Sequence, residues 1–129
     1  ENMENPQEVK VATEKYIQET ESWQRREEIA EYKNALLQYK IVFHELPDIS
    51  PKHKDARKSA IQIAKIIFEH PDLRHYVLEK KRLPINELMK HVTVSRKTIE
   101  RNRKYILAIF IILCGDYVYL KDYLKGVNL

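Results

Sequence analysis

The segment Leu83–Tyr105 reads LPINELMKHVTVSRKTIERNRKY, and this stretch decides the fold. Pro84 is suited to open a short helix of about two turns, because the first residue of a helix has no use for an amide hydrogen. We expect that helix to bury Ile85 and Leu88. After a tight turn, Ser95 supplies a side-chain oxygen of the kind that caps the start of a helix. The stretch therefore predicts a short helix, a turn and a second helix.

The second helix is basic at its start and apolar beyond it. We expect it to run from Ser95 to about Cys114, where Gly115 is placed to end it. On a helical wheel the buried direction is defined by four apolar residues, Ile99, Ile106, Phe110 and Leu113. Four polar residues point away from that direction, Lys97, Glu100, Arg101 and Lys104, and Arg96 sits at the border. The pattern predicts a basic tip in solvent and an apolar remainder in the core.

A short helix, a tight turn and a basic helix together predict a helix-turn-helix at about residues 84–114. In that motif the first helix lies across the DNA backbone, and the second places its first residues in the major groove. One position departs from the usual pattern, because Thr93 stands where the turn often holds glycine. The backbone at Thr93 must therefore avoid a positive φ or adopt it at a cost.

The candidate DNA-binding residues are Ser95, Arg96, Lys97, Thr98, Glu100, Arg101, Arg103 and Lys104. Arginine can donate two hydrogen bonds to guanine, and glutamate can accept one from cytosine, whereas lysine is better suited to phosphate oxygens. Arg103 points nearer the core side of the wheel, so we expect it to make a structural ion pair or a flanking phosphate contact. An ordinary solvated helix face is the alternative explanation of the same basic residues.

Charge is divided unevenly along the 129 residues, whose formal net charge is +4. Residues 1–50 hold eleven acidic and six basic side chains, whereas residues 51–129 hold eight acidic and seventeen basic ones. Blocks of one sign suggest a partner of the other sign. Two glycines are too few for the hairpins of a β-rich fold, and one cysteine forms no internal disulfide. The composition indicates an all-α protein of a reducing, cytoplasmic environment.

The first half of the chain extends this prediction to a compact bundle of about five to seven helices. Residues 22–43 carry an apolar stripe typical of a core-facing helix, made of Ile29, Tyr32, Leu36, Tyr39 and Phe43. Residues 1–21 are expected to form a linker or a loosely packed helix. The helical DNA-binding domain is therefore expected to span residues 22–129.

Two further helices are predicted from local signals, and a third segment has two possible structures. Ser50 followed by Pro51 predicts a helix start, and that helix is expected to run to about His70. Pro71 predicts another short helix, with Leu73, Val77 and Leu78 as its apolar contacts. Residues 116–124 are either a closing helix or an aromatic-rich tail. The first turns of the helix after Pro51 carry four bases, Lys52, Lys54, Arg57 and Lys58. That is the unfavourable end of the helix dipole for positive charge, so an outside partner or a solvated face accounts for them.

Other kinds of site find little support. No pair of histidines has the spacing of a helical zinc site, and Cys114 is expected to be a small buried hydrophobic residue. No glycine-rich phosphate loop and no enclosed pair of carboxylates is evident, so we expect no cofactor, metal, small-molecule ligand or catalysis. The longest apolar run, residues 105–114, is about half a membrane span, so no direct membrane insertion is expected. Because the chain opens without methionine, we expect a piece of a longer protein.

Four strings resemble the C-terminal domain of the sigma-I family of bacterial RNA polymerase sigma factors. They are VSRKTIERNRKYI at residues 94–106, DYVYLKDY at 116–123, SPKHKDAR at 50–57 and RREEIAEY at 25–32. The resemblance implies an all-helical domain that reads the −35 promoter element, while a separate N-terminal domain handles the −10 region. It also implies two protein partners, the RNA polymerase core and the cytoplasmic segment of a membrane-anchored anti-sigma factor.

Two other functions remain open on the residues alone. The chain could be the DNA-binding domain of a free-standing transcription regulator, whose dimer would bind two half-sites about one helical turn apart. It could also be a protein-interaction bundle, with its basic helix facing an acidic partner. Salt dependence on duplex DNA and the symmetry of the footprint distinguish these functions.

Overall fold

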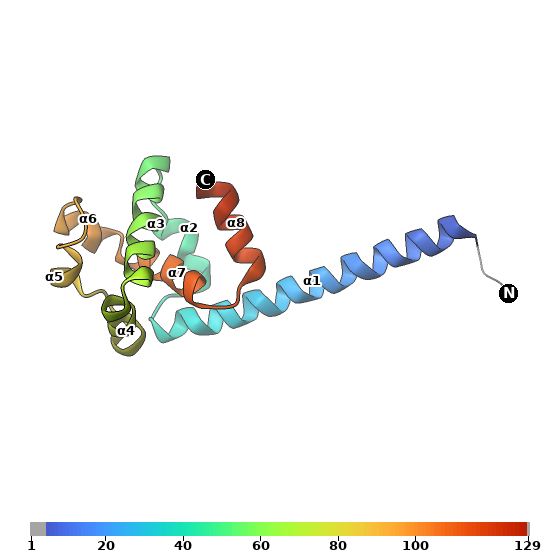
Figure 1. Ribbon diagram of the computed structural model, residues 1–129, viewed down its shortest axis with the longest axis horizontal. Coiled ribbons are helices and arrows are strands. Elements are labelled where there is room, and N and C mark those ends of the chain that lie inside the picture. The colour runs from blue at the N-terminus through green and yellow to red at the C-terminus, as the bar shows by residue number, and fades with distance from the viewer. Residues whose placement is uncertain (1–4, 129) are drawn as a thin grey trace. The chain divides into compact units, whose positions relative to one another are not determined.

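The computed structural model describes residues 5–128, and the side chains of residues 5–126 (Figure 1). Every element of secondary structure in this part of the chain is a helix: eight α-helices and one 3₁₀ helix. The all-α prediction is confirmed. There is one α-helix more than the upper end of the expected range, because a predicted loop contains a short helix and one predicted helix is divided in two. No helix among residues 5–128 is long and apolar enough to cross a membrane.

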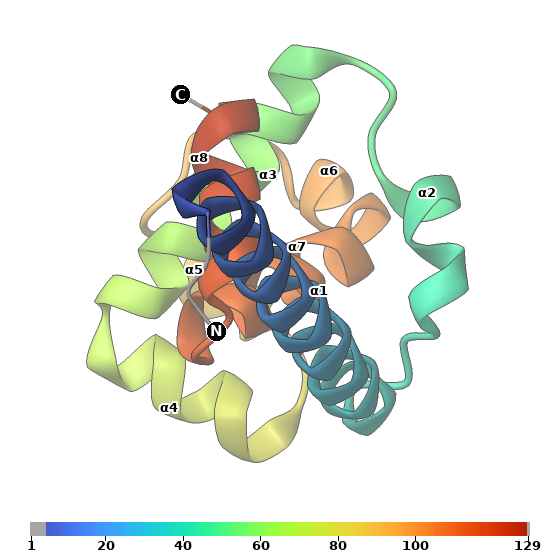
Figure 2. The same cartoon turned by 90° about the vertical axis from the view of Figure 1, so that its right-hand side faces the viewer.

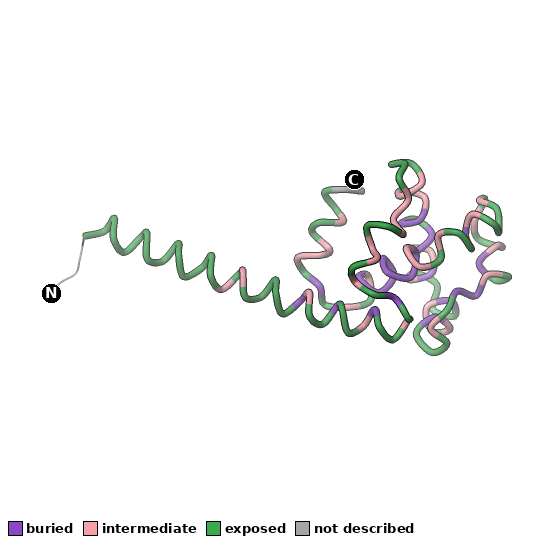
Figure 3. The backbone as a smooth tube through the Cα atoms, turned by 180° about the vertical axis from the view of Figure 1, so that it is seen from behind, coloured by how far each residue is buried: buried purple, intermediate pink, exposed green. Residues whose placement is uncertain are grey.

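The first helix, α1 (Pro6–Gln38), is one continuous element and not two. No proline or glycine stands between Gln7 and Gln38, so nothing in the sequence interrupts the helix. Contacts divide the chain inside this helix, into a unit of residues 1–31 and a unit of residues 32–129. In the first unit nearly every described side chain up to residue 27 is exposed, as the green tube of Figure 3 shows. The domain boundary at residue 22 stays a prediction.

The end of α1 comes earlier than the apolar stripe predicted. Lys40 adopts a left-handed backbone conformation with φ of 61°, and the Ile41 amide donates to the Leu36 carbonyl at 3.0 Å. This turn stops the helix, and Phe43 therefore lies in the following 3₁₀ helix, η1 (Phe43–Glu45). Tyr32 and Leu36 are buried as predicted, at 2% and 0% exposed.

The helix predicted to begin at Ser50 begins later. Residues Leu46–Ile49 form a short helix, α2, and the Ser50 amide donates to the Leu46 carbonyl at 3.0 Å, which makes Ser50 the end of α2. The next helix, α3, spans Lys54–Glu69 after the extended residue His53. The prediction of a cap at Ser50 was wrong because α2 takes up that residue, whereas the predicted end near His70 is confirmed.

The core is built around α3 and α7 (Arg103–Cys114), which lie side by side in both views (Figures 1 and 2). From α3 the inward residues are Ala60, Ile61, Ile63, Ala64 and Ile67. In α7 every residue from Ile106 to Ile112 is buried, because apolar side chains surround this part of the helix on all sides. The Tyr32 hydroxyl donates to the Ala108 carbonyl at 2.9 Å, and burial raises the pKa of that hydroxyl.

Two further helices pack against this core, α4 (Pro71–Lys80) on α3 and α8 (Val118–Asn128) on α7. As predicted, α4 starts at Pro71 and buries Leu73 and Val77, but Leu78 is 41% exposed, contrary to expectation. The closing segment is the helix α8 and not an extended tail. A second correction concerns Cys114, which is exposed and not a buried hydrophobic residue, because it stands in the last turn of α7.

Gly115 ends α7 at the predicted place through a close approach, with no left-handed turn. Its backbone is extended, with ψ of 179°. A Cβ built on Gly115 would lie 2.3 Å from Cε2 of Tyr117, whose ring is buried at 7% exposed. The Tyr117 ring in turn meets the Tyr32 ring edge to face, with centroids 5.5 Å apart. Only glycine leaves room for this ring.

Candidate nucleic-acid interface

The segment that decides the fold forms two short helices joined by a turn, α5 (Ile85–Leu88) and α6 (Arg96–Arg101). Pro84 precedes the first of them, and Leu88 is 0% exposed beneath it. This first helix has one turn and not the predicted two, because the Lys90 amide donates to the Glu87 carbonyl at 3.1 Å in a tightening turn.

The start of α6 is capped as the sequence predicts. The Ser95 Oγ accepts a hydrogen bond from the Thr98 amide at 3.1 Å, and it lies 2.9 Å from the Thr98 hydroxyl. Among the described residues only Lys40 and Lys81 are non-glycine residues with a positive φ, so Thr93 avoids the left-handed conformation. Threonine is therefore accommodated in this turn without strain.

The long helix predicted from Ser95 to Cys114 is interrupted at Asn102. The backbone there turns to φ −102° and ψ 16°, and the Asn102 amide donates to the Thr98 carbonyl at 3.1 Å. Asparagine disfavours the interior of a helix, because its short polar side chain competes for backbone hydrogen bonds. The break separates α6 from α7, although Ile99 and Ile106 on its two sides are both buried in the direction that the helical wheel predicts.

The outward face of α6 is basic and open to solvent. Arg96, Lys97, Glu100 and Arg101 are exposed, whereas Ile99 on the opposite side is 0% exposed. Within the described part of the chain, the side chains of Lys97, Glu100 and Arg101 make no ion pair or hydrogen bond. Burial of Ile99 fixes the rotation of the helix, and the free charges face away from the core.

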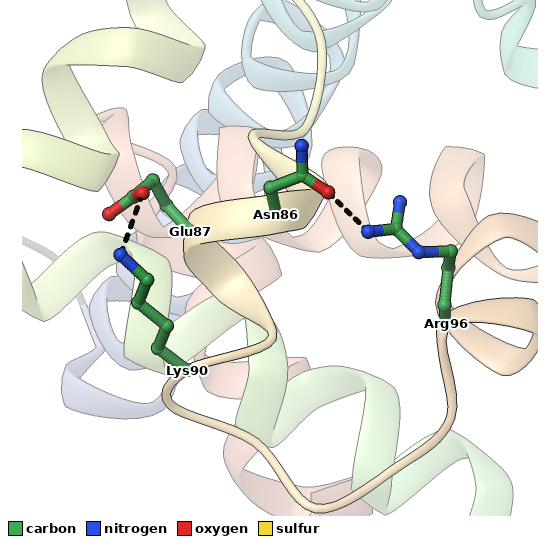
Figure 4. Close-up of polar contacts among 4 residues, drawn as sticks. All are labelled: Asn86, Glu87, Lys90 and Arg96. Atoms are coloured by element: carbon green, nitrogen blue, oxygen red, sulfur yellow. Dashed lines mark hydrogen bonds and ion pairs between the residues drawn. The ribbon is translucent and has the colours of Figure 1, made fainter.

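Arg96 differs from its neighbours because α5 holds it. One terminal nitrogen of its guanidinium donates to Oδ1 of Asn86, across the turn between the two helices (Figure 4). On the other side of α5, Lys90 and Glu87 form an ion pair at 3.0 Å. The contact between Asn86 and Arg96 links the two predicted elements of the motif through polar side chains.

Two predicted site residues lie differently from their expected orientation. Lys104 is not free on the outward face, because its Nζ lies 3.0 Å from Oε1 of Glu45, and the two side chains are 33% and 27% exposed. Hydrogen bonds from the Val42 amide and from Lys104 lower the pKa of Glu45. Arg103 is exposed and makes no ion pair among the described residues. Of the two contacts expected for it, the structural ion pair is not formed, and the flanking phosphate contact stays a prediction. The position of Lys104 is explained by its ion pair with the distant Glu45.

A groove of about 460 Å³ lies beside α6. One wall is formed by residues 48–52, and the other by residues 100–105 at the junction of α6 and α7. Basic side chains stand on both walls, with Lys52 on the first and Arg101 and Arg103 on the second. No group of three or more potential metal ligands occurs among residues 5–128.

Sequence reasoning missed the partners of the basic residues. Glu45 stands 59 positions before Lys104, and the sequence carries no signal that relates them. The Asn86 side chain stands ten positions before Arg96, with a turn between them. The string SPKHKDAR begins with residues 50–52, which line the groove, but its spacing did not show that these residues would lie against α7.

No family model matches the chain. Individual relatives do match. The chain is 51% identical to "RNA polymerase sigma factor SigI" of Bacillus subtilis (strain 168), over 93% of this chain and 48% of that protein's length. The protein of that name from Bacillus anthracis is 41% identical over 92% of the chain and 50% of its own length. "RNA polymerase sigma factor SigI7" of Acetivibrio thermocellus is 38% identical over 91% of the chain and 50% of its own length. The chain thus spans about half the length of these relatives, and over nine tenths of its own residues it matches the C-terminal domain of a SigI-family sigma factor.

Proposed function

We propose that this chain is the promoter-recognition domain of an alternative sigma factor and that it binds duplex DNA through α6. The observation that carries the proposal is the exposed basic face of this helix. Lys97 and Arg101 are free of intramolecular partners in the described structure, while Ile99 anchors the helix from behind. A positively charged helix start on a rigid support is suited to the major groove, where phosphates flank readable base edges.

The side chains divide into two roles. Arg96 and Arg101 are the proposed base-reading residues, because a guanidinium can donate two parallel hydrogen bonds to O6 and N7 of guanine. Lys97 carries a compact charge that suits a phosphate oxygen, and Glu100 can accept a hydrogen bond from cytosine N4. Ser95 and Thr98 act mainly through the cap that fixes the start of the helix.

The resemblance to sigma-I factors extends the proposal to the whole protein. The bound sequence would be the −35 element of a promoter, and the RNA polymerase core would be the first protein partner. A second partner would be the cytoplasmic segment of an anti-sigma factor, and the site of action would be the cytoplasm. The domain contributes binding and no chemistry, which agrees with relatives named as sigma factors and not as enzymes.

Selection from a randomised duplex pool, followed by sequencing of the bound fraction, tests this function. We expect one asymmetric site, because a sigma factor domain binds as a single copy. A palindromic site with half-sites about one helical turn apart would identify a free-standing dimeric regulator instead. Absence of duplex binding at low salt would favour a protein-interaction bundle.

A substitution test then connects the binding to α6. A variant with Lys97→Ala and Arg101→Ala should lose the selected site while it keeps the melting temperature of the wild type, because both side chains are exposed. Lys80→Ala is a matched control, since Lys80 is exposed at the end of α4 and its side chain makes no hydrogen bond or ion pair in the described structure. Full binding by the double variant would refute recognition through α6.

A further inference from the structure

The loop of residues 50–52, which precedes α3, lies between α3 and the start of α7. Nη1 of Arg57 donates to the carbonyl oxygens of Pro51 and Lys52, at 3.0 and 2.8 Å. On the other side, Ser50 lies beside the half-buried Tyr105 of α7, and both residues line the groove. Because Arg57 of α3 holds the backbone of this loop, Lys52 is positioned at the groove beside α6.

The guanidinium of Arg57 is therefore occupied by hydrogen bonds to the loop and is not free to bind a ligand. It caps two carbonyl groups that accept no other hydrogen bond within the described structure. The result accounts for a basic residue in the unfavourable first turn of α3. The side chain of Lys52, by contrast, is exposed and free of polar contacts among residues 5–128.

The opposite wall of the groove offers a second free cation. Arg103 is exposed at the start of α7, and no described carboxylate neutralises it. Lys104 on the same wall is already paired with Glu45. Two acidic residues, Asp48 and Glu100, also line the groove, one on each wall. Three free bases, Lys52, Arg101 and Arg103, remain against these two acids.

We propose that the loop of residues 50–52 and Arg103 form a second DNA contact, which holds the phosphate backbone of one strand in the groove beside α6. This inference rests on the proposed function and extends it beyond the recognition helix. Two features of the groove, its charge and its continuity with α6, indicate that a DNA strand occupies it. The groove has unneutralised positive charge on both walls, and one of its walls is the end of the same helix whose outward face is proposed to meet the bases.

The chemistry of the contact is independent of base sequence. Phosphate oxygens accept hydrogen bonds from Lys52 Nζ and from the Arg103 guanidinium, and such contacts fix the register of a protein on the duplex. Each contact releases condensed counterions, so it contributes about 0.9 to the slope of log affinity against log salt. Between about 50 and about 200 mM salt, one contact corresponds to a roughly 3.5-fold change in affinity.

Titration of fluorescent duplexes across that salt range tests the inference. The protein variants are Lys52→Ala, Arg103→Ala and their combination, and the duplexes are the selected site and a scrambled sequence. Each single variant should lower the salt slope by about 0.9, and the double variant by about 1.8. The losses should be equal on both duplexes, because phosphate contacts do not distinguish bases.

Lys80→Ala is again the matched control, since α4 follows the far end of α3 and a helix of 16 residues is about 24 Å long. It should leave the salt slope unchanged. If the wild type binds the selected site and Lys52→Ala and Arg103→Ala keep its full slope, the second contact is refuted while the proposed function stands. A loss confined to the selected site would also refute it, because it would indicate base contacts. If the wild type binds no duplex, the proposed function fails together with this inference.

Discussion

Leu36→Ala is the substitution that best tests whether the end of α1 belongs to the folding core. Leu36 is 0% exposed, and its neighbour Leu37 on the same helix is 58% exposed. Both substitutions exchange the same side chains in the same helix, so any effect of helix propensity is shared. The difference between the two variants therefore isolates burial.

The expected cost follows from the side chain that is removed. Truncation takes away three carbon atoms, and at about 0.8 kcal/mol each their lost transfer free energy is roughly 2.4 kcal/mol. A residual cavity of about 50 Å³ adds about 1 kcal/mol at roughly 24 cal/mol per Å³. The free energy of unfolding should thus fall by about 3.5 kcal/mol, which is a large part of the roughly 5–15 kcal/mol typical of a domain.

Urea denaturation followed by circular dichroism measures this change. For a unit of about 100 residues the loss corresponds to a fall in melting temperature of roughly 15–25 °C. Leu37→Ala should stay within about 0.5 kcal/mol of the wild type. Equal and small effects of the two substitutions would refute the reasoning, because they would place residues 32–38 outside the cooperative core.

Three other substitutions test separate parts of the structure. Arg101→Ala should cost about 1–3 kcal/mol of binding free energy on the selected duplex and relax discrimination at one or two base pairs, which competition with single-base variants measures. Equal losses on a scrambled duplex would show that Arg101 contacts phosphate and not a base. Glu45→Gln should remove a pH dependence of stability: the pKa of Glu45 is lowered, so the wild type keeps this contribution above the ordinary carboxyl range and loses it as the pH falls through the folded-state pKa. Acid titrations of the wild type and the variant that coincide would contradict this. Gly115→Ala should lower the melting temperature by several degrees or displace the Tyr117 ring, because the added Cβ would stand 2.3 Å from that ring; an unchanged near-ultraviolet spectrum and melting curve would show that the approach is not tight.

The parts of the fold that were predicted correctly depend on local signals. The Ser95 cap needs only a side-chain oxygen three residues before the amide that it accepts from, and the buried Ile99, Ile106 and Phe110 follow from helical periodicity. The same applies to Pro71 at the start of α4. In each case the residues that determine the structure lie within one or two turns of one another, so the sequence displays them together.

The predictions that failed depend on residues that are distant in sequence or on competing local signals. Ser50 was a plausible cap, but four preceding residues formed α2 and used its amide. Lys104 was expected to be free on the outward face, but the distant Glu45 forms an ion pair with it. No periodicity encodes a pairing of this kind, because tertiary packing brings the two side chains together only after the helices have formed.

The hydrogen bond between Asn86 and Arg96 has a consequence for the entropy of recognition. A free arginine samples many rotamers, and ordering such a side chain at an interface costs about 0.5–1.5 kcal/mol. In this domain Oδ1 of Asn86 already accepts a hydrogen bond from one guanidinium nitrogen of Arg96, so part of that ordering takes place when the protein folds. The remaining guanidinium donors stay available to a base. An exposed contact with little value for stability thereby reduces the loss of conformational freedom when Arg96 meets DNA.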